Sequence, residues 1–386
     1  MTVVSDLQAA IRADVDDDAP RLVYADYLAD HGDPRGELIQ LHCALARDPR
    51  DDIAARVAEL FAAHRGIWER VFEKTGARVT EWRRGFPYAV VVDDAGDFLE
   101  HRERWFATAP IGALTVNAIA HDDLGAFVRC EEVRMLDALA LGNRSNRDDD
   151  DGPGPLRDAG AAVLGGGECF DRLRTLTLAT HDIGPRGARE LAKAAWLRRL
   201  TRLDLDANPI GRDGFEQLCP ALPRLAELRL WSAIAPEPLL ALRELRVLEL
   251  TRPELGTRGA IQLAESGLTL ESLVLIDELD ATAVIALATA PSFRLHRLAL
   301  TVLDICDAGL VEIARSPQLA GLVTLGFSRT RLAGARALAA STVLAALREL
   351  ELDCPELYSV VKAIFEQRTG LPALERYELQ DEDIPF

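Results

Sequence analysis

Several features that mark common functional classes are missing from this sequence of 386 residues. Its most apolar stretch, 281–291, is interrupted by Thr282 and Thr289 and falls short of the about 20 residues that a membrane-spanning helix needs. The first ten residues hold no basic segment followed by an apolar stretch, so no secretory signal is expected. Lysine and arginine (44) are outnumbered by aspartate and glutamate (62), which gives a net charge of −18. Because phosphate binding needs a basic surface, we expect neither nucleic acid nor membrane as a partner.

Cysteine is scarce and widely spaced. Neighbouring cysteines are at least 39 positions apart, and no Cys-x-x-Cys motif is present to bind zinc or exchange disulfides. A secreted disulfide scaffold would hold its cysteines more densely. We therefore predict reduced, buried thiols and a cytoplasmic protein. The six cysteines are Cys43, Cys130, Cys169, Cys219, Cys306 and Cys354.

Motifs for catalysis or metal binding are also missing. The seven histidines show no metal-ligand spacing, no Gly-x-Ser-x-Gly elbow occurs, and the triple-glycine run lacks the Lys and Ser of a phosphate loop. An acidic loop starting at residue 146 fails the calcium pattern, because Asp151 replaces the required glycine and Arg157 the final glutamate. His42 and Cys43 are adjacent on a predicted helix and point about 100° apart. We predict a non-enzymatic protein without catalytic residues, metal or cofactor.

A leucine pattern repeats from about residue 110 onward. The phrase Leu-x-x-Leu-x-Leu occurs, for example, at 200–205 and 270–275. Its period-2 leucines predict a short strand, and the small-residue run that follows, as at 187–195, predicts a helix of two or three turns. Most copies are 25 to 27 residues apart. The middle position of the phrase falls at 114, 139, 176, 203, 228, 248, 273, 298, 325, 350 and 377.

The repeat length determines how the copies must assemble. One strand and one helix in about 25 residues cannot bury their own apolar face, so neighbouring copies must stack. Strands lie about 4.8 Å apart whereas helices need about 10 Å, so the stack must curve with its sheet inside. The sequence therefore predicts an α/β solenoid with a curved parallel sheet inside and helices outside.

These copies resemble leucine-rich repeats. Two segments, Ile-Gly-Pro-Arg-Gly-Ala-Arg-Glu-Leu at 183–191 and Asn-Pro-Ile-Gly-Arg-Asp-Gly-Phe at 208–215, are similar to the ribonuclease-inhibitor-like class. The resemblance covers roughly 70% of the chain and implies the same solenoid. One departure is clear: the family's asparagine three residues after the last leucine occurs only as Asn208. The other turns must satisfy their backbone groups in a different way.

Two copies are irregular. The 37-residue copy contains a polar, acidic segment at 142–155, which we predict to be a loop outside the solenoid. The 20-residue copy has Pro236 and Pro238 where the other copies have a helix. Because proline disrupts helix interiors, this copy is predicted to have an extended or single-turn segment.

The N-terminal part does not repeat. Its sequence predicts a first helix ending near Ala13, a second that starts at Asp16–Pro20 and is closed by Gly32, and a third opened by Asp33 and Pro34. A fourth helix is predicted over 51–64. The run 16–41 resembles the bacterial repeat-companion domain, a short module that precedes repeats in bacterial protein families and implies no catalytic activity.

The segment between this module and the repeats is predicted to cap the solenoid. An apolar strand starting at Trp82 and a helix at 97–107 indicate an atypical strand–helix unit. The predicted organisation is therefore a helical repeat-companion module at 1–48, a helix plus capping unit at 49–108, and a solenoid of about eleven repeats at 109–386.

The residues that alternate with the strand leucines must face the inner side of the sheet. Two acidic stretches there flank a centre of low charge, in which Trp231 and Ile276 are large and apolar. Such a centre is typical of protein interfaces, although strand-compatible residues on a solvated face remain an alternative. The predicted protein-binding residues are Asp204, Asp206, Arg229, Trp231, Glu249, Thr251, Val274, Ile276, Glu351 and Asp353.

Together these features favour a cytoplasmic scaffold that binds a protein with a basic surface on the inner face of the sheet. Two alternatives stay open: a regulator or adaptor of a partner enzyme, of the GTPase-activating or ligase type, and binding through the N-terminal module with the solenoid as a spacer. Ligase types carry a separate catalytic domain, whereas only about 110 residues lie outside the repeats here. The sequence leaves the partner, the pathway, the oligomeric state and the role of 142–155 open.

Overall fold

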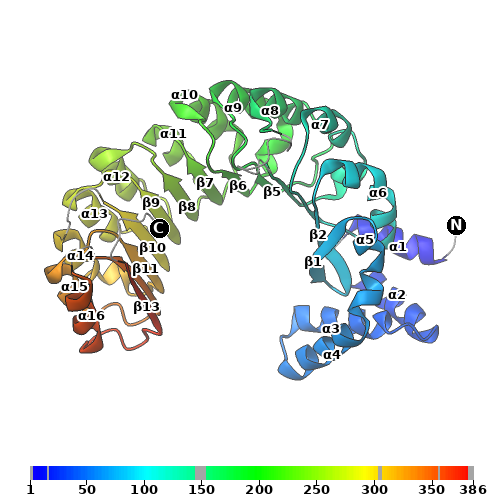
Figure 1. Ribbon diagram of the computed structural model, residues 1–386, viewed down its shortest axis with the longest axis horizontal. Helices are drawn as coiled ribbons and strands as arrows, with labels where there is room; N and C mark the ends of the chain where they lie inside the picture. Colours follow the sequence, from blue (N-terminus) through cyan, green and yellow to red (C-terminus); the bar gives the residue numbers. More distant parts are fainter. Residues whose placement is uncertain (1–2, 15–16, 144–153, 303–306, 355–356, 381–386) are drawn as a thin grey trace. The chain divides into compact units, whose positions relative to one another are not determined.

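A computed structural model describes residues 3–14, 17–143, 154–302, 307–354 and 357–380 (Figure 1). The chain forms two compact units. The first comprises Met1–Leu156 and Gly167–Thr177, and the second comprises Arg157–Gly166 and Leu178–Phe386. In the described part of the chain, no helix is both long and apolar enough to cross a membrane.

The first unit begins with helices, as the sequence predicts. The first helix ends at Ala13, the second carries Pro20 in its first turn, and the third begins directly after Pro34. The fourth helix continues to Trp68, four residues past its predicted end. Gly32 follows the second helix with a φ of 71°, a conformation that glycine adopts without strain. The helices are α1 (Val3–Ala13), α2 (Ala19–Asp30), α3 (Arg35–Arg47), α4 (Asp51–Trp68) and α5 (Arg70–Glu73).

The capping unit differs from its prediction. Instead of one strand, it forms an antiparallel hairpin of β1 (Ala77–Arg83) and β2 (Phe86–Val92), followed by α6 (Ala95–Thr108). The two turn residues, Arg84 and Gly85, both have positive φ, which matches the right-handed twist of a hairpin. The strand β1 was not predicted, because this half-exposed edge strand carries polar residues and no leucine repeat.

The rest of the first unit begins the repeat series. Its strands follow sequence order, and β2, β3, β4 and β5 are parallel. The paired positions Leu114, Leu139 and Leu176 coincide with the predicted middle positions of the repeat. These elements are β3 (Ala113–Val116), α7 (His121–Phe127), η1 (Glu132–Met135), β4 (Ala138–Leu141) and β5 (Thr175–Thr177).

The second unit consists of stacked strand–helix repeats. Its parallel strands line the inner side and its helices the outer side (Figure 1). The strands are β6 (Arg202–Leu205), β7 (Glu227–Trp231), β8 (Val247–Thr251), β9 (Ser272–Ile276), β10 (Arg297–Thr301), β11 (Thr324–Phe327), β12 (Glu349–Asp353) and β13 (Arg376–Gln380).

Helical segments alternate with these strands. The α-helices are α8 (Arg157–Gly165), α9 (Pro185–Ala192), α10 (Gly211–Leu218), α11 (Pro236–Leu240), α12 (Gly256–Glu265), α13 (Ala281–Ala288), α14 (Asp307–Ile313), α15 (Leu332–Ala339) and α16 (Tyr358–Glu366). Three 3₁₀ turns accompany them, η2 (Ala195–Arg199), η3 (Cys219–Ala221) and η4 (Pro317–Leu319). The single turn of α11 confirms the prediction for the copy with two prolines.

The leucine register of the sequence is the register of the sheet. The middle leucines pair across successive strands, from Leu203 with Leu228 in β6 and β7 to Leu325 with Leu350 in β11 and β12. The leucines at these positions are at most 2% exposed, so each strand contributes one side chain to a continuous core. The protein is an α/β leucine-rich-repeat solenoid with helices at its N-terminal end.

The turns after the strands are held by different side chains. Asn208 donates from Nδ2 to the carbonyl of Leu178 (2.8 Å) and accepts at Oδ1 from the N–H groups of His181 and Ile183 (3.1 and 2.9 Å). Other repeats use other oxygens: Ser232 accepts from Gly211 N–H at 2.7 Å. Asp277 and Ser328 also accept hydrogen bonds from backbone N–H groups. Different side chains thus take the place of the family's asparagine in these turns.

Candidate binding surface of the second unit

The inner face is defined here as the surface of β6–β13 formed by residues that alternate with the buried leucines. Strand pairing places Asp204, Arg229, Glu249 and Val274 side by side in one row. Of the ten predicted binding residues, Arg229 and Trp231 are exposed and six are partly exposed. Those six are Asp204, Asp206, Glu249, Thr251, Ile276 and Glu351, and the other two, Val274 and Asp353, are buried.

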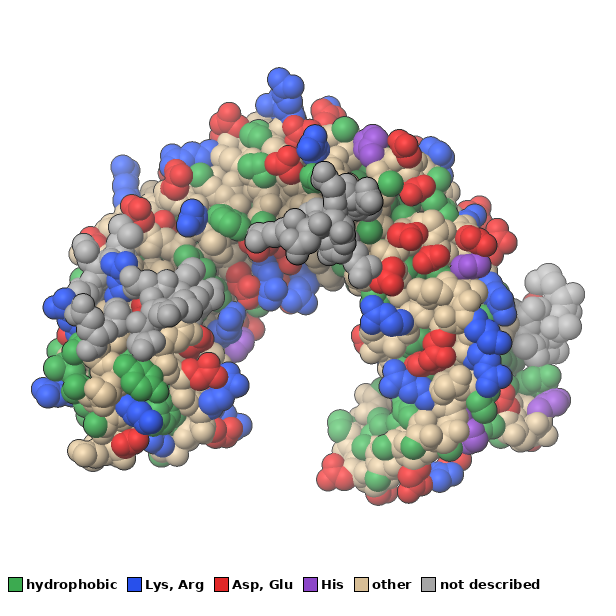
Figure 2. Space-filling view, in the orientation of Figure 1, with side chains coloured by type: hydrophobic (Ala, Val, Ile, Leu, Met, Phe, Trp, Pro, Cys, Tyr) green, Lys and Arg blue, Asp and Glu red, His purple; other side chains and the backbone are tan. Residues whose placement is uncertain are grey.

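Ion pairs connect the strands of the inner face. Glu249 on β8 accepts hydrogen bonds from two arginines, Arg229 on β7 and Arg297 on β10. The closest N···O distances are 3.0 Å to Arg229 and 3.1 Å to Arg297. Figure 2 shows acidic and basic side chains interspersed along this side of the unit. The centre of the face is therefore crossed by paired charges rather than being free of charge.

The bridge between Arg297 and Glu249 explains why Val274 is buried. Strand β9 pairs with β8 on one side and with β10 on the other, so a side-chain contact from β8 to β10 must pass over β9. Beneath it, Ser272 is 4% and Val274 8% exposed. The prediction that Val274 lies open on the inner face is wrong, because long charged side chains from both neighbouring strands cover it.

Asp353 is the second correction. It ends β12, and its side chain is 1% exposed instead of facing solvent. Its carboxylate accepts from the N–H of Arg329 at 3.3 Å, and its carbonyl oxygen accepts from the N–H of Thr330 at 2.7 Å. The side chain of Asp353 binds the turn after β11. The prediction from strand alternation that it faces solvent on the inner face is therefore wrong.

Trp231 is the large apolar side chain that the inner face exposes most, at 42%. The guanidinium carbon of Arg252 lies 5.9 Å from the centre of its indole ring, within the range of a cation–π interaction. Arg252 follows β8 directly and has a φ of 50°. This arginine is not among the predicted binding residues, because the strand alternation ends at Thr251. The sequence signal that could have identified Arg252 is its position directly after the end of β8.

Two acidic groups flank this region. Asp204 Oδ1 accepts from the N–H of Asp206 at 3.0 Å, and burial, followed by the Asp204 charge, raises the pKa of Asp206. At the other end, burial and then Glu378 raise the pKa of Glu351, whose Oε1 accepts from Gln380 Nε2 at 2.6 Å. Both ends of the face hold carboxylates that a cation would stabilise.

The described residues offer no group of three or more His, Cys, Asp or Glu side chains placed to hold a metal ion. The acidic run around Asp151 lies outside the described residues. The five described cysteines are all buried and unbridged, as predicted, whereas Cys306 lies outside the described residues. Burial raises the pKa of Cys43 and of Cys169 to about 11, and that of Cys219 to about 12. These thiols are protonated at neutral pH and are poor nucleophiles.

No family model matches the sequence. Over 227 residues the chain is 31% identical to a ribonuclease inhibitor of Sus scrofa, a match that covers 51% of this chain and 49% of that protein. The chain thus spans about half the length of this curated relative. The match agrees with the ribonuclease-inhibitor-like segments in the repeats.

Several solved structures are also similar to the chain. A TLR13–ssRNA13 complex has 21% identity and a TM-score of 0.41 and covers 71% of this chain and 36% of that chain. An LRR protein of Leptospira interrogans has 15% identity and a TM-score of 0.35, with 70% and 67% covered. Internalin C2 of Listeria monocytogenes has 16% identity and a TM-score of 0.32, with 64% and 83% covered.

Proposed function

We propose that this protein is a non-enzymatic scaffold that binds a protein partner on the inner face of its second unit. The relative from Sus scrofa is named for inhibiting a ribonuclease, which is an action on another protein. The segments that resemble this class lie in the repeats, and the inner face is the broad surface that repeats of this kind present. Fold alone does not define function, so the proposal rests on the side chains of the face.

The observation that carries the proposal is the exposure of Trp231. A tryptophan that is 42% exposed on a strand loses its apolar contact with water only when another surface covers it. Around it, Arg229 and Glu249 form a polar border that a partner can pair with at the edge of the contact. Aromatic residues within a polar border are the usual energetic centres of protein interfaces.

The charges of the face favour a partner with a basic surface. Among the described residues, Asp204 and Asp206 have no basic side chain within 4.0 Å. Asp204 lies in β6, next to the strand β7 that carries Trp231, and Asp206 follows the end of β6. A cationic partner would stabilise the charged form of Asp206, whose pKa burial raises. It would also approach faster at low salt, because the chain has a net charge of −18.

The finer assignments belong to the same proposal. The helical segment 1–48 is proposed to be a repeat-companion module of bacterial type, on the strength of the sequence run 16–41. A cytoplasmic location is supported by the buried, unbridged thiols. Regulation of a partner enzyme is compatible with such a scaffold, because the bound protein can itself be the enzyme.

The test compares three full-length forms of the protein. Proteins retained from a native lysate by the wild-type chain are identified, and the affinity of the retained partner is then measured with purified components. Trp231→Ala should weaken binding by about 2 kcal/mol or more without unfolding the protein. Glu265→Lys, an exposed change at the end of α12 on the outer side, should leave the affinity unchanged. Loss of binding in the control with full binding in Trp231→Ala would move the interface away from the inner face.

A further inference from the structure

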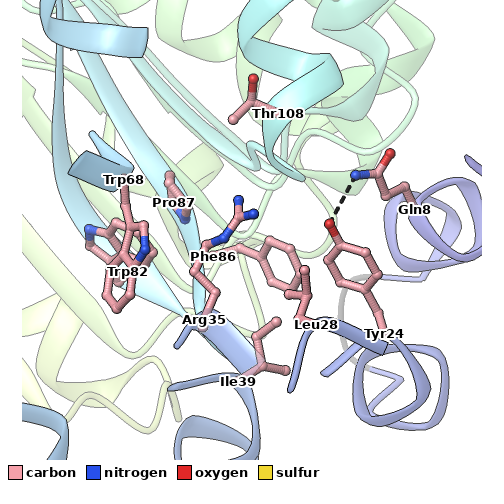
Figure 3. Close-up of a pocket in the computed structure, with 11 residues that line it drawn as sticks. Gln8, Tyr24, Leu28, Arg35, Ile39, Trp68, Trp82, Phe86, Pro87 and Thr108 are labelled. Atoms are coloured by element: carbon pink, nitrogen blue, oxygen red, sulfur yellow. Dashed lines mark hydrogen bonds between the residues drawn. The ribbon is translucent and has the colours of Figure 1, made fainter. Parts of the chain in front are cut away.

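A cavity of about 190 Å³ lies within the first unit, between the N-terminal helices and the β1–β2 hairpin (Figure 3). Tyr24 and Leu28 of α2 and Arg35 of α3 line it on one side. Trp82 and Phe86 of the hairpin line it on the other. The cavity plays no part in the inner face, and the sequence patterns of the module did not indicate it.

The apolar side chains that line the cavity are packed in the core of the first unit. Leu28 is 6%, Ile39 0% and Phe86 8% exposed, and all three belong to one buried cluster. The rings of Tyr24 and Phe86 stack at 6.1 Å between centroids. Because these side chains are packed from behind, the space exists before any ligand enters, so a ligand would not have to pay the cost of ordering the site.

The polar groups of the cavity are mainly hydrogen-bond donors. Asp33 Oδ2 accepts from Nε and Nη2 of Arg35, at 2.8 and 2.5 Å, which fixes the plane of the guanidinium. Nη1 makes no hydrogen bond to any of the described residues, and the guanidinium points toward the middle of the cavity in Figure 3. Tyr24 accepts at its hydroxyl from Gln8 Nε2 at 3.3 Å, so its own proton remains available to donate.

No acidic side chain lines the cavity. Nη1 of Arg35 and the Tyr24 hydroxyl suit a ligand that brings its own acceptor, and a carboxylate can accept from both. The volume lies below the about 300 Å³ at which pockets for drug-sized ligands begin, so it suits a single ring with a short acidic group.

We propose that this cavity binds a small aromatic carboxylate. The aromatic ring of the ligand would lie among Phe86, Leu28 and Trp82. The carboxylate of the ligand would accept a hydrogen bond from Nη1 of Arg35, with the Tyr24 hydroxyl as a second donor. The site is independent of the inner face, so the two proposals succeed or fail separately.

Isothermal titration of the full chain with phenylacetate and with the neutral phenylacetamide tests the site. The acid should bind about tenfold more tightly than the amide, because only the acid forms a charge-assisted hydrogen bond. Arg35→Gln should remove this difference and leave amide binding unchanged. Arg56→Gln is the matched control, since Arg56 is an exposed, ion-paired arginine of the same unit outside the cavity.

A second variant covers the case in which Arg35→Gln fails to fold. Tyr24→Phe keeps the packed ring and removes only the hydroxyl, and it should weaken phenylacetate binding several-fold. The tripeptide Gly-Gly-Phe tests whether the cavity instead binds the aromatic residue and terminal carboxylate at the C-terminus of a polypeptide. The proposal is overturned if the acid and the amide bind wild type equally, if neither binds at millimolar concentration, or if the tripeptide binds more tightly than phenylacetate.

Discussion

The repeats of the second unit and the hairpin region of the first unit are stabilised in different ways. In the second unit, each strand pairs with the next one along the chain, and one buried leucine per copy repeats the same contact. In the first unit, single contacts join residues far apart in sequence: Arg84 pairs with Asp18, 66 residues away, and Gly85 N–H donates to His42 Nδ1, 43 residues away. In the second unit the stabilising contacts are distributed along the repeats, whereas in the hairpin region of the first unit they are concentrated at the turn.

The largest expected effect is the removal of one repeated leucine. Leu273 is completely buried at the middle of β9, so Leu273→Ala leaves a cavity between two layers. The free energy of unfolding should fall by about 2–5 kcal/mol. Denaturant unfolding of the full chain measures this change. Glu249→Ala on the adjacent strand is the control, because each of its two partly exposed ion pairs contributes about 1 kcal/mol or less. Equal losses in the two variants would contradict the leucine register.

A smaller effect should come from the hairpin turn. Gly85 has a φ of 83°, and a Cβ added there would lie 2.5 Å from Ile39 Cγ1 and 2.6 Å from Ile39 Cα. Gly85→Ala should therefore cost the backbone strain of about 1–3 kcal/mol and an additional clash with α3. Gly32→Ala is the matched control, with a φ of 71° and no atom within 4 Å of the added Cβ. Thermal unfolding should show a clearly larger drop for Gly85→Ala, and equal drops would mean that the turn does not dock on α3.

The smallest effect concerns pH. Burial lowers the pKa of His42 below 6.5, and its Nδ1 accepts the Gly85 N–H at 3.1 Å in the neutral form. The unfolded chain binds a proton near pH 6.5 while the folded chain does not, so this contribution to stability is complete above pH 6.5 and declines as the pH falls toward the folded pKa. His42→Asn retains an acceptor and does not titrate, so unfolding curves between pH 7.5 and 5.5 should depend less on pH in this variant. An unchanged slope would exclude His42 as the cause.

The repeats were predictable from sequence because a buried parallel strand needs a leucine at a fixed spacing. Leu203 and Leu273 could be placed by counting alone, and so could the single turn at Pro236 and Pro238. The strand β1 could not, because an antiparallel edge strand that is half exposed has no such requirement. Its partner is chosen by the turn at Gly85 and by contacts with α3, which leave no periodic pattern.

The candidate surface was predicted in part. Alternation placed Trp231 and Arg229 on the inner face, because both lie within a regular strand. It failed for Val274, since the exposure of a small side chain depends on the length of its neighbours, here Arg297 and Glu249. It failed for Asp353, because this last residue of the strand turns its carboxylate to the backbone of the turn after β11. The cavity of the first unit could not be predicted, because α1, α2, α3, α4, α6 and the hairpin form it jointly.

The side chains that hold the turns have a consequence for how such a chain can evolve. Asn208 bonds to the backbone of the preceding copy at Leu178 and His181, and Ser232 bonds to Gly211 of the copy before its own. Each turn is thus matched to one particular neighbour. Deleting or duplicating one copy, or a block of copies, creates one new junction at which an unmatched side chain meets an unmatched backbone, so a change in length needs a compensating substitution at that junction.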